Sequence, residues 1–249
     1  MTTLLLFTII MYLSMTISGV IGFAGNVIAL PLLSLILDLP TAVAVLALCS
    51  FIQTVIQSVQ NRMYIHWQES LKIILLSCLS MPIGLFFLRY FPEAASKLLL
   101  GVFVLIIALQ PMIQNLLRSH RANTPTAKPW DWLYLVIGGI FSGAFASGGP
   151  LIVIYCTHRL SDKNIFRGTM FFSGCFSMGL VALEHFFQHH YTADTMLLTG
   201  IALVVMVVAI YTSTWIAGKV DTQRFHTLVN LALVFAGAML VLQNTAALL

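Results

Sequence analysis

The stretch GAFASGGP (residues 143–150) matches an earlier stretch, GVIGFAGN (residues 19–26), at a constant offset of 124 residues. Both stretches are rich in small residues and lie in nearly uncharged surroundings. The match continues downstream, where His66-Trp67 falls on His190-Tyr191 at the same offset. The chain therefore consists of two matched halves, each with a glycine-interrupted apolar segment in the same place.

The composition indicates a membrane protein. Of its 249 residues, 59% are hydrophobic and 8% are charged, and the mean hydropathy is +0.97. Apolar windows of 18 residues or more recur along the whole chain, and each can cross ~30 Å of hydrocarbon. The runs are continuous rather than alternating, which favours helices over a β-barrel. We therefore predict an all-α polytopic membrane protein. The net charge is +4, and the basic residues lie in the predicted loops between spans. They therefore indicate how the protein is oriented in the membrane rather than a nucleic-acid partner.

Ten apolar elements follow one another along the sequence. They run over approximately residues 3–23, 26–37, 42–60, 71–89, 97–117, 132–147, 150–158, 165–187, 195–216 and 225–246. The second and the seventh are too short to span alone, so each forms with its predecessor a broken or re-entrant helix. The predicted division is a first membrane repeat (1–117), a cytoplasmic linker (118–131) and a second membrane repeat (132–249).

The distribution of Lys and Arg predicts the orientation. If every element reverses direction, only Arg89 and Lys97 fall on one side, and the other ten basic residues fall on the opposite side. Merging each short element with its neighbour into one crossing splits the same residues seven to five. The positive-inside rule favours the first arrangement. It predicts a multi-pass protein of the cell (inner) membrane with both termini outside the cytoplasm. It also predicts two inverted repeats of about five helical elements each.

The glycine motifs are the predicted centre of the function, because paired helix breaks in matched halves mark the binding site of many transporters. The predicted substrate-binding residues at the breaks are Gly22, Gly25, Asn26, Ser147, Gly148 and Gly149. Asn26 is a good N-cap and Pro150 suits a first helical position, so a short helix is expected after each break. Pro31 falls inside the first of these short helices, so an alternative is that this helix begins at Pro31. Helix N-termini attract anions, although glycines also serve tight helix packing.

A polar stripe follows each break. The predicted pathway-lining residues are Gln53 and Gln57 in the first half and Thr169, Ser173 and Ser177 in the second. Spacing of four places each set on one helical face. Polar side chains at this depth need a wet cavity or a partner, so hydrogen bonding between helices is the competing explanation.

Two further residue sets have conventional explanations. Glu184, His185, His189 and His190 have helical ligand spacing for a metal or a pH sensor, but an interfacial helix end is the favoured explanation. The four cysteines lie in apolar runs without a C-x-x-C pair, which is typical of packing residues. We therefore predict no metal and no cofactor.

The motifs resemble those of a known family. GFAGNVIALP (22–31) and GAFASGGPLIVIY (143–155) are similar to the paired glycine-rich segments of the TauE/SafE sulfite exporter family. His66-Trp67 and Arg167-Gly168-Thr169 also fit. The resemblance covers nearly the whole chain and implies a permease for small anions such as sulfite, thiosulfate, sulfonates or related carboxylates. Ala24, Asn26 and Ala146 depart from the glycines that are frequent in the family, so no substrate is transferred.

The leading hypothesis is a secondary transporter, not an enzyme, for a small and sulfur-containing or related organic anion. Its expected partners are the anion, the lipid bilayer and a coupling ion (H⁺ or Na⁺). The coupling ion, the direction of transport and the oligomeric state are left open. An intramembrane serine hydrolase is an alternative, with Ser147 as nucleophile and His185 as base. A channel or an accessory membrane subunit is a third.

Overall fold

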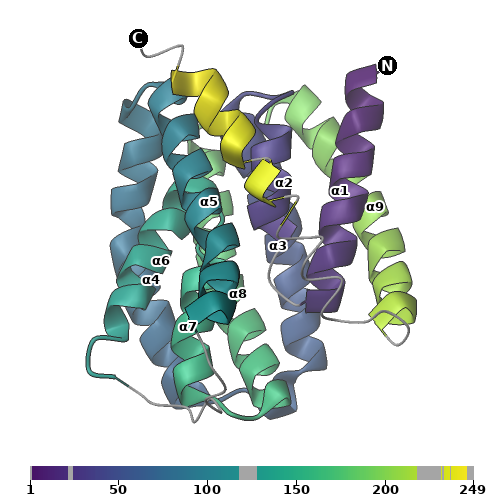
Figure 1. Cartoon of the computed structure of the whole chain (residues 1–249). Coiled ribbons are helices and arrows are strands. Elements are labelled where there is room, and N and C mark those ends of the chain that lie inside the picture. Colours follow the sequence, from purple (N-terminus) through teal and green to yellow (C-terminus); the bar gives the residue numbers. More distant parts are fainter. Residues whose placement is uncertain are drawn as a thin grey trace. The chain divides into compact units, whose positions relative to one another are not determined.

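The computed structural model describes residues 2–21, 25–117, 128–217, 231, 233–235 and 237–245. Over these residues the chain is all-helical, as predicted (Figure 1). The helices are α1 (Thr2–Ile21), α2 (Gly25–Leu33), α3 (Leu39–Gln60), α4 (Trp67–Tyr90), α5 (Glu93–Leu117), α6 (Trp132–Phe145), α7 (Gly149–Arg159), α8 (Lys163–Phe187) and α9 (Ala193–Ala217), with a short 3-10 helix η1 (Arg62–Tyr64). Another apolar helix covers Leu233–Thr245.

The helices confirm a multi-pass membrane protein. Four of them are long and apolar enough to cross a bilayer: Leu39–Gln60, Trp67–Tyr90, Asn164–Phe187 and Ala193–Ser213. The first nine predicted elements each have a helix at their position, and the tenth (225–246) begins outside the described residues. Helix α4 begins at Trp67, before the predicted residue 71, because the His66 ring accepts a hydrogen bond from the Glu69 N–H (3.3 Å) and caps a polar first turn.

The prediction for the start of α2 was wrong. Helix α2 begins at Gly25, so Asn26 lies in its first turn and is not the N-cap, and Pro31 lies inside the helix rather than at its start. Pro31 has no N–H and so cannot donate to the Val27 carbonyl, and α2 ends two residues after it, at Leu33. The Ser34 hydroxyl then donates to the Pro31 carbonyl (2.8 Å), which satisfies one of the last carbonyls of the helix.

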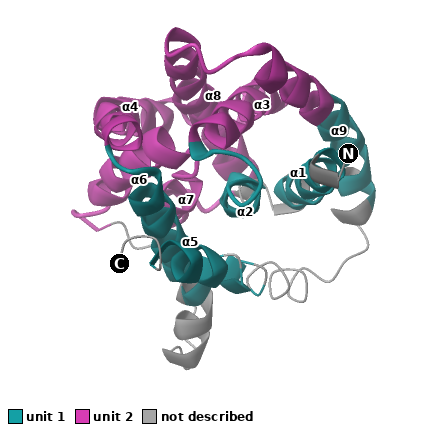
Figure 2. Cartoon of the chain, turned by 90° about the horizontal axis from the view of Figure 1, so that it is seen from above, with its two compact units in different colours: residues 1–39, 91–123, 204–249 teal, residues 40–90, 124–203 magenta. Residues whose placement is uncertain are grey.

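The chain forms two compact units (Figure 2). Unit 1 contains residues 1–39, 91–123 and 204–249, and unit 2 contains residues 40–90 and 124–203. Each unit thus takes segments from both halves of the sequence. Compactness does not test a sequence repeat, so the repeat boundaries 1–117 and 132–249 stay a prediction, and most of the linker 118–131 lies outside the described residues.

Within unit 2, helices α4 and α6 run parallel in close contact along small residues. A Cβ added at Gly139 would collide with Ser77 and Ser80, and further along both helices one at Gly84 would collide with the Ile140 carbonyl. The Ser77 hydroxyl also donates to the Leu135 carbonyl (3.3 Å). Such small-residue contacts let helix backbones approach closely in membranes.

Helices α3 and α8 run antiparallel in the same unit. A Cβ at Gly174 would lie 3.1 Å from Thr54, and one at Gly179 would lie 3.1 Å from the Phe51 ring. The loop after each helix covers the start of the other. A Cβ at Gly168 would lie 2.9 Å from the Tyr64 carbonyl, and the Tyr191 hydroxyl donates to the Ala44 carbonyl (3.2 Å).

These reciprocal contacts use matching positions. Ala44 and Gly168, the two covered residues, are related by the offset of 124 residues found in the sequence. The residues that cover them, Tyr64 and Tyr191, are not related by this offset, and the inverted repeat stays a prediction.

Candidate functional site

The second glycine motif forms a tight turn between α6 and α7. Ala146 follows α6 with a left-handed backbone (φ 49°), and its N–H donates to the Ser142 carbonyl (2.9 Å). A left-handed residue at this position ends a helix and is usually glycine, so an alanine here carries strain. Helix α7 begins three residues later at Gly149, with Pro150 in its first turn as predicted.

Helix α7 folds back along α6, so the pair forms a re-entrant hairpin. Near the turn, a Cβ at Gly138 of α6 would lie 3.2 Å from Ile152 of α7. At the far end of α7, the His158 ring lies 2.9 Å from Asp131, the residue before α6. This hairpin rules out the alternative in which α6 and α7 merge into one crossing. With 14 and 11 residues, the two helices are about 21 and 16 Å long, so neither spans ~30 Å alone.

The hairpin tip (residues 146–149) and the adjoining end of α6 each contain a buried hydroxyl group that has no partner among the described residues. Ser147 in the turn and Ser142 in the last turn of α6 are each 1% exposed. Their hydroxyl groups have no hydrogen-bond partner among the described residues. A Cβ at Gly148 would collide with the Gly138 carbonyl and with Ser142 Oγ, so only glycine fits there. Unpartnered buried hydroxyls are unfavourable unless a ligand or water completes them.

Two stripe residues of α8 have structural contacts. The Thr169 hydroxyl accepts a hydrogen bond from the His66 N–H (3.0 Å), which holds the loop before α4. The Ser173 hydroxyl donates to the Thr169 carbonyl of its own helix (2.8 Å). These contacts support the competing explanation for part of the stripe. Ser177 and Gln53 are buried and Gln57 is partly exposed, and their lining role stays a prediction.

The first glycine motif lies in unit 1. Gly22 is outside the described residues. Gly25 packs back against α1, where an added Cβ would lie 2.7 Å from Ser18 Cβ and 3.1 Å from the Ser14 carbonyl. Ser14 and Ser18 match Gly138 and Ser142 at the offset of 124 residues, although Gly148, which contacts Gly138 and Ser142, lies one position before the match of Gly25. The roles of Gly25 and Asn26 in binding stay predictions.

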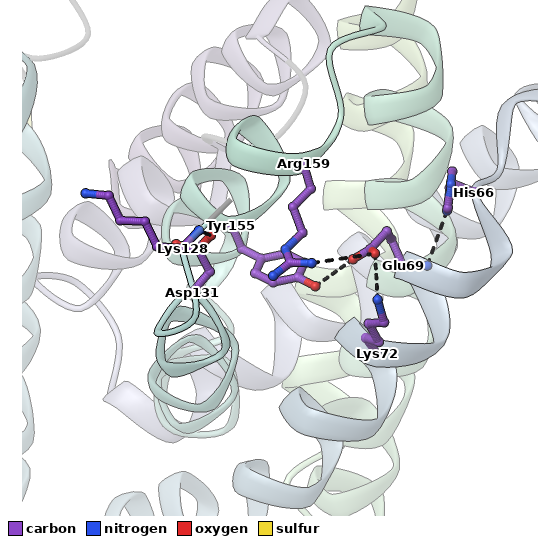
Figure 3. Close-up of polar contacts among 7 residues, drawn as sticks. All are labelled: His66, Glu69, Lys72, Lys128, Asp131, Tyr155 and Arg159. Carbon is purple, nitrogen blue, oxygen red and sulfur yellow. Dashed lines mark hydrogen bonds and ion pairs between the residues drawn. The ribbon is translucent and has the colours of Figure 1, made fainter. Parts of the chain in front are cut away.

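A charged group of residues, which we call the base cluster, holds the open end of the second hairpin (Figure 3). Glu69 in the first turn of α4 accepts hydrogen bonds from the Tyr155 hydroxyl (2.6 Å) and from Lys72 (2.8 Å). Arg159 lies 4.0 Å from the same carboxylate. The members of the base cluster are Glu69, Lys72, Asp131, Tyr155, His158 and Arg159.

Asp131 is the second anion of the base cluster and is 1% exposed. Burial opposes its ionisation, but the Lys128 N–H (2.8 Å) and the His158 ring outweigh that effect, so the pKa of the Asp131 carboxyl is below its ordinary value. The base cluster therefore fastens the end of α7 to the start of α4 through Glu69 and to the start of α6 through Asp131.

The histidine group gives no support for a metal site or a hydrolase. Among the described residues, no group of three His, Cys, Asp or Glu side chains is placed to hold a metal ion. His185 and His190 face each other with their Nδ1 atoms 2.7 Å apart. Within the described part of the chain, Ser147 Oγ and His185 Nε2 have no hydrogen-bond partner, so they do not form a nucleophile–base pair.

These observations define a class: a multi-pass helical membrane protein with a re-entrant hairpin whose tip contains unpaired hydroxyl groups. The chain belongs to the sulfite exporter TauE/SafE family, whose family model matches residues 6–240. The match confirms the resemblance seen in the sequence and assigns the protein to a family of membrane transporters. No curated protein and no solved structure matches the chain.

Proposed function

We propose that this protein is a secondary permease that carries a small oxyanion, such as sulfite, thiosulfate, a sulfonate or a related organic anion. The α6–α7 hairpin tip binds the anion. The observation that carries the proposal is the pair of buried, unpartnered hydroxyl groups of Ser142 and Ser147 beside the N-terminus of α7. Hydroxyl donors and a helix N-terminus both favour an anion.

The positions of Lys and Arg in the sequence support an anion-binding site at the hairpin tip that contains no fixed cation. No Lys or Arg occurs between residues 132 and 158 or between residues 168 and 218. An anion at the hairpin tip would thus be bound by neutral donors in a low-dielectric surrounding, where hydrogen bonds are strong. Binding without a permanent counter-charge also leaves the anion free to dissociate on the other side.

The positions of the Lys and Arg residues in unit 2 also support the proposed orientation in the membrane. The ends of α3 and α7 and the starts of α4, α6 and α8 lie at one end of unit 2, as the contacts of Gly168, Glu69 and Asp131 require. The basic residues at this end are Arg62, Lys72, Lys128, Arg159, Lys163 and Arg167, whereas Arg89 lies at the other end of α4. By the positive-inside rule this end of unit 2 faces the cytoplasm, which supports the orientation proposed from the sequence.

Transport by purified protein in liposomes tests the proposal. We expect saturable, gradient-dependent flux of labelled sulfite. Ser147→Ala should lower Vmax/KM about tenfold because a charge-assisted hydrogen bond to the anion is lost. Ser213→Ala is the matched control, since its buried hydroxyl is already bonded to the Ile210 carbonyl of its own helix (2.9 Å). Unchanged flux in Ser147→Ala and in the double variant with Ser142→Ala would contradict the site.

Thermal-shift measurements identify the anion. Ligands that bind the folded state raise its melting temperature by mass action, so sulfite, thiosulfate, methanesulfonate and simple carboxylates can be ranked with detergent-solubilised protein. Non-saturable flux would instead indicate a channel.

A further inference from the structure

The carboxylates of the base cluster have all their oxygen atoms occupied. The two Glu69 oxygens accept from Lys72 and Tyr155. The two Asp131 oxygens pair with the Lys128 N–H and with His158. Each oxygen thus has one closer partner than Arg159, the remaining cation of the cluster, which makes no hydrogen bond to Glu69.

Arg159 has no hydrogen bond within the described part of the chain. Its closest anionic atom is a Glu69 oxygen at 4.0 Å, which is an ion pair without a hydrogen bond, and its side chain is 29% exposed. Its guanidinium lies over the Tyr155 ring, 5.0 Å from the centroid. Tyr155 is itself fixed by its 2.6 Å bond to Glu69 (Figure 3). The guanidinium is thus oriented by its neighbours while its N–H groups stay available.

We propose that Arg159 binds the small anion at the base of the hairpin before it reaches the tip, an inference that rests on the proposed function. A guanidinium donates two parallel hydrogen bonds to a carboxylate, sulfonate or sulfite group. Arg159 is the last residue of α7 and Gly149 the first, so the two positions lie about 15 Å apart along one helix. The ligand is an oxyanion, which a lipid phosphate group also offers.

Arg89 provides a matched control. It too lies over a tyrosine ring, 5.4 Å from the centroid of Tyr90, but at the opposite end of α4 and outside the base cluster. Arg159→Gln and Arg89→Gln therefore remove the same charge and the same ring contact from two ends of unit 2. Arg159→Lys keeps the charge and the pairing with Glu69 but loses the two-pronged donor.

The experiment measures sulfite flux from the Arg159 side of oriented proteoliposomes, made either with zwitterionic lipid alone or with an added anionic phospholipid. We expect Arg159→Gln to raise KM about tenfold with Vmax within about twofold, Arg159→Lys to give an intermediate KM, and Arg89→Gln to leave KM unchanged. A merely structural role would lower Vmax or the amount of folded protein in Arg159→Gln and would spare Arg159→Lys.

The outcomes separate the possible failures. If the wild type carries sulfite and Arg159→Gln keeps the wild-type KM, the role of Arg159 is wrong and the permease stands. If KM changes only in liposomes that contain an anionic phospholipid, Arg159 binds lipid phosphate, and its role as a substrate residue is overturned. If the wild type carries none of sulfite, thiosulfate and methanesulfonate, the proposed function itself fails.

Discussion

The two glycine-rich segments of this chain are similar where the short helix begins against the preceding helix, and they differ where the short helix ends. In α1–α2, Gly25 packs against Ser14 and Ser18. In α6–α7, Gly148 packs against the matching residues Gly138 and Ser142. The open ends have nothing in common. Tyr155, His158 and Arg159 of α7 match Pro31, Ser34 and Leu35 after the offset of 124 residues.

This difference shows how duplicated elements acquire separate roles. The second hairpin is fastened to α4 and α6 by the base cluster, so α7 is held at both of its ends. The matching end of α2 is buried and apolar, with Leu33 fully buried, and residues 31–37 contain no charged side chain that could form such a cluster. We therefore expect the second hairpin to be the more stable of the two, with an anion-binding tip on a rigid support.

The largest expected effect is at Gly148. Gly148→Val should abolish transport and lower the free energy of unfolding by at least ~3 kcal/mol, because the Cβ would collide with the Gly138 backbone. Gly25→Val should cost less, since a Cβ at Gly25 would lie 2.7 Å from Ser18 Cβ, which is a milder overlap than that of Gly148 with the Gly138 carbonyl. Denaturation of both variants in detergent gives the comparison. Equal losses at the two positions would contradict the tighter packing of the second hairpin.

Removing the carboxylate of the base cluster should have the next largest effect. Glu69→Gln should lower stability by about 2 kcal/mol, because it weakens the Tyr155 and Lys72 bonds of a side chain that is 11% exposed. Hydrogen exchange should rise in α7 and stay unchanged in α2. The control is Glu93→Gln, whose pairing with Lys97 is half-exposed and should be worth under about 1 kcal/mol. Faster exchange in α2 instead would show that the cluster does not act on α7.

The pH dependence of stability should depend on Asp131. Because the folded-state pKa of this carboxyl is lowered, its contribution is fully present above the ordinary Asp pKa of about 3.9. It is lost as the pH falls through the lower, folded-state value. Asp131→Asn should be less stable than the wild type at neutral pH, and the two should converge in acid. A constant difference between them from pH 7 to about pH 3 would rule out this linkage.

The smallest effect should be a gain. Ala146→Gly should raise stability by about 1 kcal/mol, because glycine adopts the left-handed backbone (φ 49°) without strain. Ala144→Gly, within α6, should lower stability by a similar amount. Thermal unfolding of the pair checks the sign, and a loss of stability in Ala146→Gly would contradict the strained turn.

The helices and the second hairpin were predictable because they depend on local signals. Continuous apolar runs set the helix positions, and the glycines with Pro150 marked the break at residues 146–149. The start of α2 was predicted wrongly because Pro31 and Asn26 are ambiguous signals near a helix end.

The base cluster was not predicted, because its residues are distant in sequence. Glu69, Asp131 and Tyr155 come from three different helix ends, and a single acid beside an apolar run is ordinarily a solvated group. The sequence does contain one signal: Glu69 and Asp131 lie at the starts of two helices, and α7 ends with the basic residues His158 and Arg159. The lining role of Thr169 stays a prediction, and its contact with His66 was not predictable because it depends on tertiary packing.

A direct test of the account is to locate a bound anion. Selenite is the heavier analogue of sulfite, and its anomalous scattering marks its position in a crystal of the full chain. The account predicts a peak within about 3 Å of Ser147 Oγ that disappears in Ser147→Ala. A protein that carries selenite saturably but shows the ion only at positions away from the hairpin tip would contradict it.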